Sequence, residues 1–198
     1  SYLLKLLLTN LRESGMHICA LDPEMEYEDL TNNLGGCFID LMSGDYIINP
    51  LEPKTWDDAG SPEDLDAPQT FRIRSRLSQH ISFLKDFFRS YKDFTDREID
   101  VIEIMLQKLY ARWGLTDQSD FDRLDSGDYP ILSDLYAFIE EEYRAFDAKN
   151  YPLYTAEMLQ SILLGLNSMC VGAESKFFNG HTNITDDSFI TFGVKGLL

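Results

Sequence analysis

The sequence has few cysteines and no long hydrophobic run. Its 198 residues include three cysteines, which lie far apart and form no Cys-x-x-Cys pair, so neither a zinc site nor a disulfide framework is indicated. Each of them, Cys19, Cys37 and Cys170, stands in an apolar run, and we expect all three to be buried thiols in a reducing compartment. No apolar run approaches the roughly 20 residues of a membrane-spanning helix, and no secretion signal is expected.

Positive charge is also scarce. The chain has 17 Lys and Arg residues against 34 Asp and Glu residues, which gives a net charge of −17. Because neutralising phosphates takes clustered Lys and Arg side chains, no direct nucleic-acid partner is expected. The sequence is nevertheless 44% hydrophobic and 13% aromatic, which is too rich in core-forming residues for a disordered acidic tail. These numbers predict an acidic, soluble globular protein inside the cell.

The N-terminal part of the chain alternates between patterns typical of helices and of short buried strands. Leucines at helical spacing predict a helix over residues 2–14, and a second, brief helix is expected over residues 26–33. Short apolar runs predict strands over residues 17–21, 37–42 and 46–48. Helices and buried strands in this order indicate an α/β fold.

The rest of the chain has a different pattern. A proline-containing acidic segment without apolar periodicity, residues 53–68, is predicted to be a linker. Residues 69–175 are predicted to form an all-α insertion, in which Thr95 and Glu98 have the spacing of a capping box. Residues 176–198 contain a run of β-forming residues and are expected to return to the sheet. The helices expected within the insertion cover residues 71–91, 94–113, 130–146 and 155–167.

One predicted helix runs against the overall charge. Within residues 71–92, six cations accompany a single acid, Asp86. This helix either presents a basic face to nucleic acid or an acidic partner, or packs against acidic neighbours. We favour packing, because the basic and aromatic residues do not interleave as in single-strand binders. The cations are Arg72, Arg74, Arg76, Lys85, Arg89 and Lys92, and the aromatic residues expected to form core are Phe83, Phe87, Phe88, Tyr91 and Phe94.

The densest group of carboxylates follows the first predicted strand. Asp22, Glu24 and Glu26 lie within five residues at a strand-to-helix turn that contains Pro23. Ligands of open α/β sheets bind outside the carboxyl ends of strands, so these acids are suited to polarise a water molecule or to hold a divalent ion. Alternatively, Asp22 caps the helix that follows and the glutamates favour its N-terminus. Spacing alone favours the capping interpretation.

Other motifs of catalysis are absent from the sequence. There is no complete G-x-x-x-x-G-K-[ST] phosphate loop and no G-x-S-x-G elbow. The three histidines have no spacing typical of metal ligands. The turn at Asp22 is therefore the candidate site that the residues themselves indicate.

Six short segments occur in an order and spacing found in a known family. They are Ser1-Tyr2-Leu3-Leu4-Lys5, Leu21-Asp22-Pro23-Glu24-Met25-Glu26-Tyr27, Leu34-Gly35-Gly36, Ile48-Asn49-Pro50-Leu51, Phe178-Asn179-Gly180-His181-Thr182-Asn183 and Phe189-Ile190-Thr191-Phe192. In this order they resemble the conjugative-transfer ATPases, which are the VirB-type ATPases of type IV secretion systems within the FtsK/HerA-like P-loop superfamily. The resemblance covers nearly the whole chain, including an all-α insertion before the returning strand.

The resemblance implies a partial RecA-like P-loop core, with residues 1–52 as its first part, that hydrolyses ATP with Mg²⁺. Ser1 resembles the hydroxyl residue that closes the phosphate loop, which makes it the candidate cofactor and metal ligand. Asp22 and Glu26 resemble the acidic pair that faces the nucleotide and are the candidate catalytic residues. The family's Gly-Lys would precede Ser1 and its Asp-Glu strand would follow Leu198, so the chain is expected to be an excerpt that is inactive alone.

The resemblance also implies partners and a location. Members of the family assemble with copies of themselves into rings, commonly hexamers, at the cytoplasmic side of the membrane, to which other secretion or conjugation components attach them. The expected function is a motor that powers conjugative DNA transfer or type IV secretion. Two other classes stay open, namely a non-catalytic helical interaction module of the secretion machinery and a HerA-like DNA translocase.

Overall fold

The structure, a computed structural model, divides into two compact units. It describes residues 2–53, 76–150, 153–184 and 188–195. Residues 1–48 and 182–198 form one unit, and residues 49–181 form the other. We call them the sheet unit and the helical unit. The predicted linker over residues 53–68 lies outside the described residues apart from Pro53.

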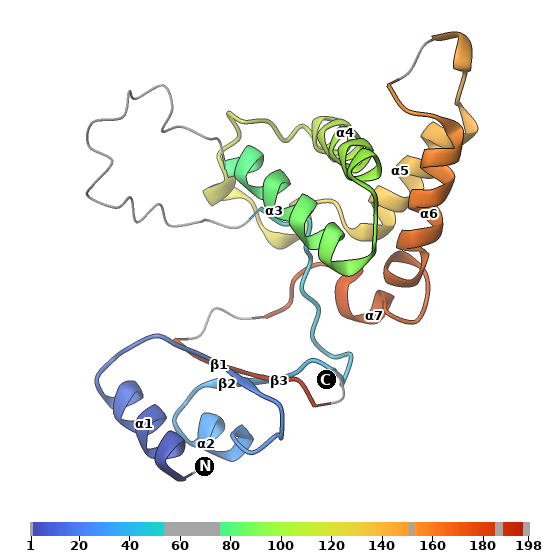
Figure 1. Ribbon diagram of the computed structural model, residues 1–198. Helices are drawn as coiled ribbons and strands as arrows, with labels where there is room; N and C mark the ends of the chain where they lie inside the picture. The colour runs from blue at the N-terminus through green and yellow to red at the C-terminus, as the bar shows by residue number, and fades with distance from the viewer. Residues whose placement is uncertain (1, 54–75, 151–152, 185–187, 196–198) are drawn as a thin grey trace, which may run out of the picture. The chain divides into compact units, whose positions relative to one another are not determined.

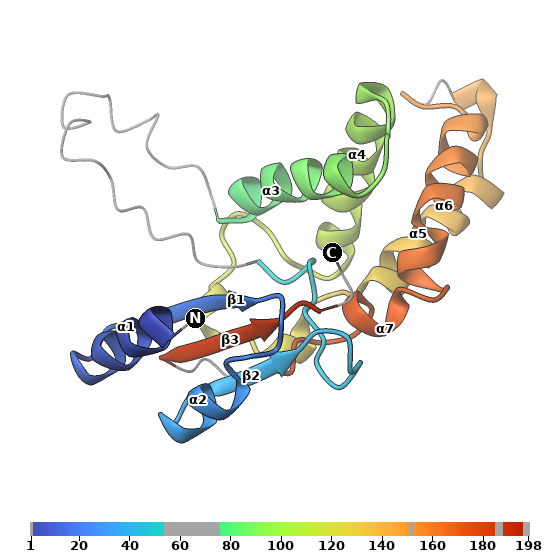
Figure 2. The ribbon, with the colours of Figure 1, turned by 60° about the horizontal axis from the view of Figure 1, so that its bottom comes forward.

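The sheet unit contains a parallel sheet with the strand order β1-β3-β2 (Figures 1 and 2). Its elements are the helices α1 (Tyr2–Glu13) and α2 (Glu28–Asn33) and the strands β1 (Ile18–Asp22), β2 (Cys37–Asp40) and β3 (Phe189–Gly193). Parallel neighbours need a crossover connection, and the connection from β2 to β3 contains the whole helical unit. The expected return of the chain to the sheet is confirmed, with β3 between the two N-terminal strands (Figure 2).

One face of this sheet is covered by the unit's own helices. Phe189 and Thr191 of β3 are fully buried, whereas Phe192, which points to the opposite face, is only partly buried. Phe189 belongs to a small apolar cluster with Leu8 of α1. The hydroxyl groups of Thr31 in α2 and Thr191 share a buried hydrogen bond of 2.7 Å. Helices α1 and α2 therefore cover one side of the sheet, and the other side is open within the described residues of this unit.

The helical unit packs around α4, which contacts α3, α5 and α6. Its helices are α3 (Arg76–Tyr91), α4 (Asp96–Arg112), α5 (Leu132–Arg144), α6 (Ala156–Cys170) and the short α7 (Ser175–Phe178), and its 3-10 turns cover Phe121–Arg123, Ser126–Asp128 and Ala148–Asn150. Ile102, Leu106 and Leu109 of α4 have no exposed surface. An α/β fold in which most residues are helical is confirmed. The short helix α7 and the 3-10 turns were not predicted from the apolar periodicity.

The predicted capping box of α4 is present. The Thr95 hydroxyl accepts a hydrogen bond from the Glu98 backbone N–H at 3.3 Å, and the Glu98 carboxylate accepts one from the Thr95 N–H at 2.7 Å. At the other end, Gly114 has a φ of 75°, which lies in the left-handed region. Glycine adopts this conformation at little cost. Local side-chain chemistry therefore sets both ends of this helix.

The described cations of α3 pack against acidic neighbours, as the favoured interpretation predicts. Arg76 pairs with Asp122 at 2.9 Å, and Lys85 pairs with Glu103 of α4. Arg89 pairs with Asp86 at 2.9 Å. Arg72 and Arg74 lie outside the described residues. Among the aromatic residues of this region, Phe88 has no exposed surface and Phe83 is 38% exposed, while Phe87, Tyr91 and Phe94 are partly buried against the core.

Two predictions are wrong. Residues 46–48 are not a strand, because Ile47 directs its backbone N–H to the Asn183 side chain at 2.7 Å instead of into a ladder. Cys19 is exposed and Cys37 is partly exposed, because both point to the open face of the sheet. Cys170 is buried as expected, and burial raises its pKa to about 12.

No helix within the described ranges is both long enough and apolar enough to span a membrane.

Candidate functional site

The candidate site lies at the carboxyl edge of the parallel sheet. Strands β1 and β2 end at Asp22 and Asp40, and both residues are in register with Gly193 of the central strand β3. The Leu41 N–H donates to the Gly193 carbonyl at 3.1 Å, and the Val194 N–H donates to the Asp22 carbonyl at 3.1 Å. The backbone of this edge is therefore paired across all three strands. Two aspartates flank a glycine at the place where α/β sheets bind ligands.

Asp22 organises the turn that follows β1. Its side chain has no exposed surface, and its carboxylate accepts the Tyr27 N–H at 2.8 Å and the Glu24 N–H at 3.3 Å. A buried carboxylate is costly unless hydrogen bonds compensate for the lost hydration. Helix α2 begins after Tyr27, which has no side-chain cap. Asp22 thus holds the turn in front of the helix. It bonds backbone N–H groups, as the capping interpretation predicts, but it does not occupy the N-cap position, which is Tyr27.

Glu24 and Glu26 point outward from this turn. Both side chains are exposed, whereas Met25 between them is partly buried and Tyr27 is buried. The Tyr27 ring belongs to the small core of the sheet unit and lies 5.6 Å from the Lys5 ammonium of α1. The structure therefore places Asp22 and Glu26 on one turn, with one carboxylate inside and one outside. Ser1, the third candidate, lies outside the described residues.

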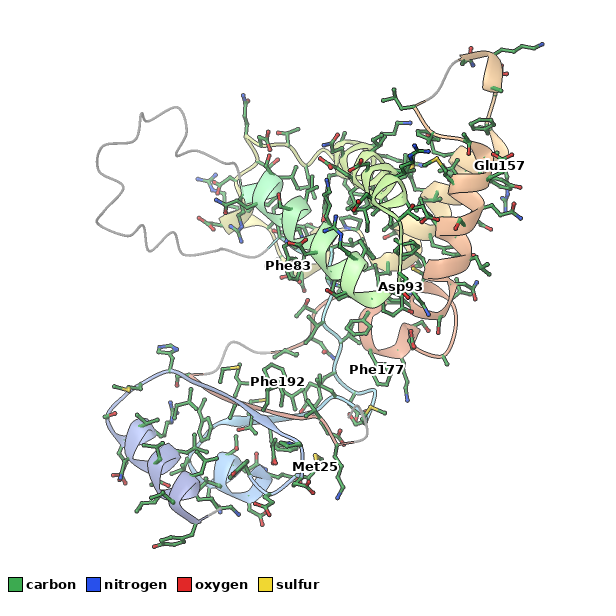
Figure 3. All side chains as sticks on the ribbon, in the orientation of Figure 1. Met25, Phe83, Asp93, Glu157, Phe177 and Phe192 are labelled. Atoms are coloured by element: carbon green, nitrogen blue, oxygen red, sulfur yellow. The ribbon has the colours of Figure 1, made fainter. Side chains whose placement is uncertain are left out.

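Met25 has an unusual backbone conformation. Its φ is 60°, and within the described ranges no other non-glycine residue has a positive φ. A left-handed conformation costs an L-residue about 1–2 kcal/mol, and such residues persist where the surrounding structure holds them. The Met25 side chain lies at the end of the sheet (Figure 3), against Gly193. The sequence did not point to Met25, because nothing in the pattern distinguishes it from a surface methionine.

Asp40 is the second residue of the edge that the sequence analysis did not select. It follows the apolar residues at the start of β2, as Asp22 follows those of β1. Its carboxylate accepts the Met42 N–H at 2.9 Å and is partly exposed. The sequence predicts a strand over residues 37–42 that includes Asp40, whereas β2 ends at this residue. The sequence does contain a signal for Asp40, because two short apolar runs, one in each strand, both end in an aspartate.

The described residues do not form a metal site by themselves. Within the described ranges, no group of three or more His, Cys, Asp or Glu side chains stands close enough to hold an ion. Both oxygens of Asp22 already accept backbone N–H groups. Magnesium is usually bound by one or two carboxylates together with substrate phosphates and waters. The edge thus offers oxygen ligands, but not a complete set of them.

Amide side chains from the shared motifs hold loops in both units. In the sheet unit, Asn183 accepts the Ile47 N–H at 2.7 Å and donates to the Asp45 carbonyl at 2.8 Å. In the helical unit, Asn49 donates to the Pro130 carbonyl at 2.9 Å, and Asn179 accepts the Ser133 N–H at 2.7 Å. These asparagines therefore fix the backbone of loops. This structural role accounts for them without any contact to the sheet edge.

The helical unit has hollows of its own. One of about 640 Å³ lies where α4 and α6 begin and is lined by Thr95, Glu98 and Glu157 among others. Another of about 490 Å³ runs along α5 and α6 beside Leu164, whose side chain is 80% exposed. Acidic side chains outnumber basic ones among the residues that line each hollow, so both are poorly suited to bind a phosphate.

Comparison with solved structures gives an informative match. No protein-family profile and no curated protein matches the sequence. Among solved structures, VirB4 of Thermoanaerobacter pseudethanolicus is similar, with a TM-score of 0.79 and 27% sequence identity over 99% of this chain and 47% of that chain. This chain thus spans about half the length of the VirB4 chain. The resemblance that the six motifs indicated is confirmed, and so is the α/β fold.

Proposed function

We propose that this VirB4-like chain is part of an ATPase motor that powers conjugative DNA transfer or type IV secretion. The observation that supports the proposal is the match to VirB4, which extends over 99% of this chain, so it includes both the sheet unit and the helical unit. The sheet unit would supply the first part of the RecA-like nucleotide-binding core. The helical unit would be an insertion between two neighbouring strands of that core.

The candidate residues take distinct roles in this proposal. Ser1 would offer its hydroxyl to the magnesium ion that accompanies ATP, and bound magnesium would neutralise charge on the phosphates. Asp22 is buried and bonded to the Tyr27 and Glu24 N–H groups, so its work is to orient the turn. Glu26 is exposed on the same turn and would orient or deprotonate the attacking water.

The proposed partners follow from the same resemblance. Copies of the protein would form a ring, and other secretion or conjugation components would bind it at the cytoplasmic face of the membrane. Direct nucleic-acid contact is not proposed for this chain. The ion pairs of Arg76, Lys85 and Arg89 with acidic neighbours support this, since they occupy the cations of α3.

The proposal is tested by ATP hydrolysis in the complete protein. Removing a general base typically lowers the rate by about 10²- to 10⁴-fold, so Glu26→Gln should lower kcat at least a hundredfold while nucleotide binding persists. Glu24→Gln is the matched control, because Glu24 is an exposed glutamate of the same turn, and it should keep most of the activity. Wild-type protein without ATP hydrolysis would overturn the function. Full activity of Glu26→Gln would overturn only the role of this residue.

A further inference from the structure

The turn between β1 and α2 is fastened to the sheet at three points. Asp22 holds its backbone by hydrogen bonds to the Tyr27 and Glu24 N–H groups. Tyr27 is 8% exposed and packs with Leu8, Ile18 and Phe189. The third point is Met25, in the middle of the turn, whose side chain lies against Gly193 at the end of the central strand.

Gly193 leaves space for Met25 at this end of β3. A methyl group on Gly193 would lie 2.8 Å from Cζ of Phe38 and closer still to Sδ of Met25. Real Cβ atoms do not approach other atoms so closely, so any larger residue at this position must displace both Met25 and Phe38. The absence of a side chain at Gly193 and the inward direction of Met25 are thus two parts of one contact.

The backbone of Met25 fits this contact. Its φ is 60° and its side chain lies against Gly193 of the sheet, while the neighbouring residues Glu24 and Glu26 are exposed. Strained conformations are kept only where the surroundings determine them. Here the surroundings are Gly193 and the two hydrogen bonds of Asp22.

We propose that Met25 is a positioning residue that holds the Asp22–Tyr27 turn, and with it Glu26, at a fixed place on the end of β3. This inference rests on the proposed function, because it gives Met25 a role in the reaction that Glu26 would serve. Glu26 is the next residue along the chain, so a shift of Met25 moves the carboxylate directly. Because Met25 contacts β3, which is the central strand, a displacement of this strand would also move the turn.

The test is a double-mutant cycle between Met25 and Gly193 in the complete protein. Misplacement of a catalytic group by about 1 Å can cost about a hundredfold in rate, so Met25→Ala and Gly193→Ala should each lower kcat for ATP hydrolysis roughly ten- to hundredfold. The KM for ATP should change little. If Gly193→Ala acts by displacing Met25, it should lower kcat much less when Met25 is already alanine.

Hydrogen exchange supplies a readout that does not depend on catalysis. Met25→Ala should raise the exchange rate of the amides of residues 24–27 roughly tenfold or more, since the turn loses its contact with the sheet. Two matched controls should leave kcat and exchange unchanged. Met16→Ala alters a methionine that is 54% exposed, and Gly127→Ala alters a glycine with open space around it.

The outcomes separate the two proposals. Wild-type protein that does not hydrolyse ATP would overturn the proposed function, and it would overturn the role of Met25 in catalysis with it. Wild-type activity together with normal kcat in Met25→Ala, or unchanged exchange at residues 24–27, would overturn the positioning role alone. Additive losses in the double variant would also contradict it, because they would show that Gly193 acts without Met25.

Discussion

The helical unit buries its large apolar side chains, whereas the sheet unit leaves many of its own exposed. Leu84, Ile102 and Met105 in the helical unit have no exposed surface. In the sheet unit, by contrast, Leu3 is 75% exposed and Leu21 is 69% exposed. Parallel sheets are normally covered on both faces. The two units therefore differ in how far their own residues can stabilise them.

The two units also differ in how they use their polar side chains. The helical unit holds several of its cations in ion pairs, such as Lys85 with Glu103, and its polar side chains hold helix ends and loops. The sheet unit has a small core but carries the buried Asp22 and the strained Met25 at one edge. Residues held in unfavourable states cluster at functional sites. The unit with less internal stability is therefore the one that carries the candidate site.

The largest effect is expected from a substitution in the small core. Phe189 has no exposed surface, and replacing a buried Phe with Ala typically costs about 3–5 kcal/mol. We expect Phe189→Ala to unfold the sheet unit while the helices of the other unit persist. Circular dichroism should then show retained helix content, and hydrogen exchange should show loss of protection in β1, β2 and β3.

Phe192→Ala is the control in the same strand. Phe192 points to the opposite, open face and is partly exposed, so its loss should cost much less than that of Phe189. Equal effects of the two variants would show that both faces of the sheet are buried in solution. Simultaneous loss of all helix signal in Phe189→Ala would show that the two units unfold together, and the comparison would fail.

A smaller effect is expected from a substitution in the large core. Leu106 is fully buried on α4, and Leu→Ala in a core typically costs about 2–5 kcal/mol. A well-filled core can absorb part of this loss without unfolding, so Leu106→Ala should lower the midpoint of thermal unfolding of the helices but leave β3 protected from exchange. Leu164→Ala, at a position that is 80% exposed, should leave the midpoint unchanged. Loss of protection in β3 on Leu106→Ala would contradict independent units.

Sequence reasoning succeeded where local chemistry decides the structure. Thr95 and Glu98 cap α4 as their spacing predicts, and the leucine period of residues 2–14 marks α1. It was less reliable where the chain meets another segment. Residues 46–48 read as a strand, but Asn183, far away in the sequence, takes the backbone of Ile47. No local pattern contains that information.

The candidate site was predictable in part. The acids that follow an apolar run predict a site at Asp22, Glu24 and Glu26, from which the family resemblance selects Asp22 and Glu26, and the structure places these two on one turn. Met25 and Gly193 were not found, because their contact joins two segments that only the order of the strands brings together. Cys19 was predicted to be buried from its apolar neighbours, but its strand has an open face.

The smallest effect concerns the polar surface of the helical unit and depends on pH. Lys108 of α4 donates to Glu142 of α5 at 2.7 Å and to the Tyr154 hydroxyl at 3.0 Å, and Tyr154 also bonds to Glu142. Burial alone would raise the pKa of Glu142, but the hydrogen bonds from Lys108 and Tyr154 outweigh it and lower this pKa below the ordinary value. The charged form of Glu142 therefore stabilises the folded state.

The sign of the pH dependence follows from this lowered pKa. Its contribution is present above the pKa of about 4.3 that Glu has in the unfolded chain, and it is lost as the pH falls through the lower, folded value. Because the Lys108 side chain is 44% exposed, solvent screening keeps the contribution below about 1 kcal/mol. Glu142→Gln should therefore be slightly less stable than wild type near neutral pH and equally stable in acid, as measured by urea unfolding across pH. Glu140→Gln, in a pair whose Arg144 is 73% exposed, should show no such difference. A gap that widens in acid would mean that the burial of Glu142 outweighs its hydrogen bonds and that its charged form destabilises the folded state.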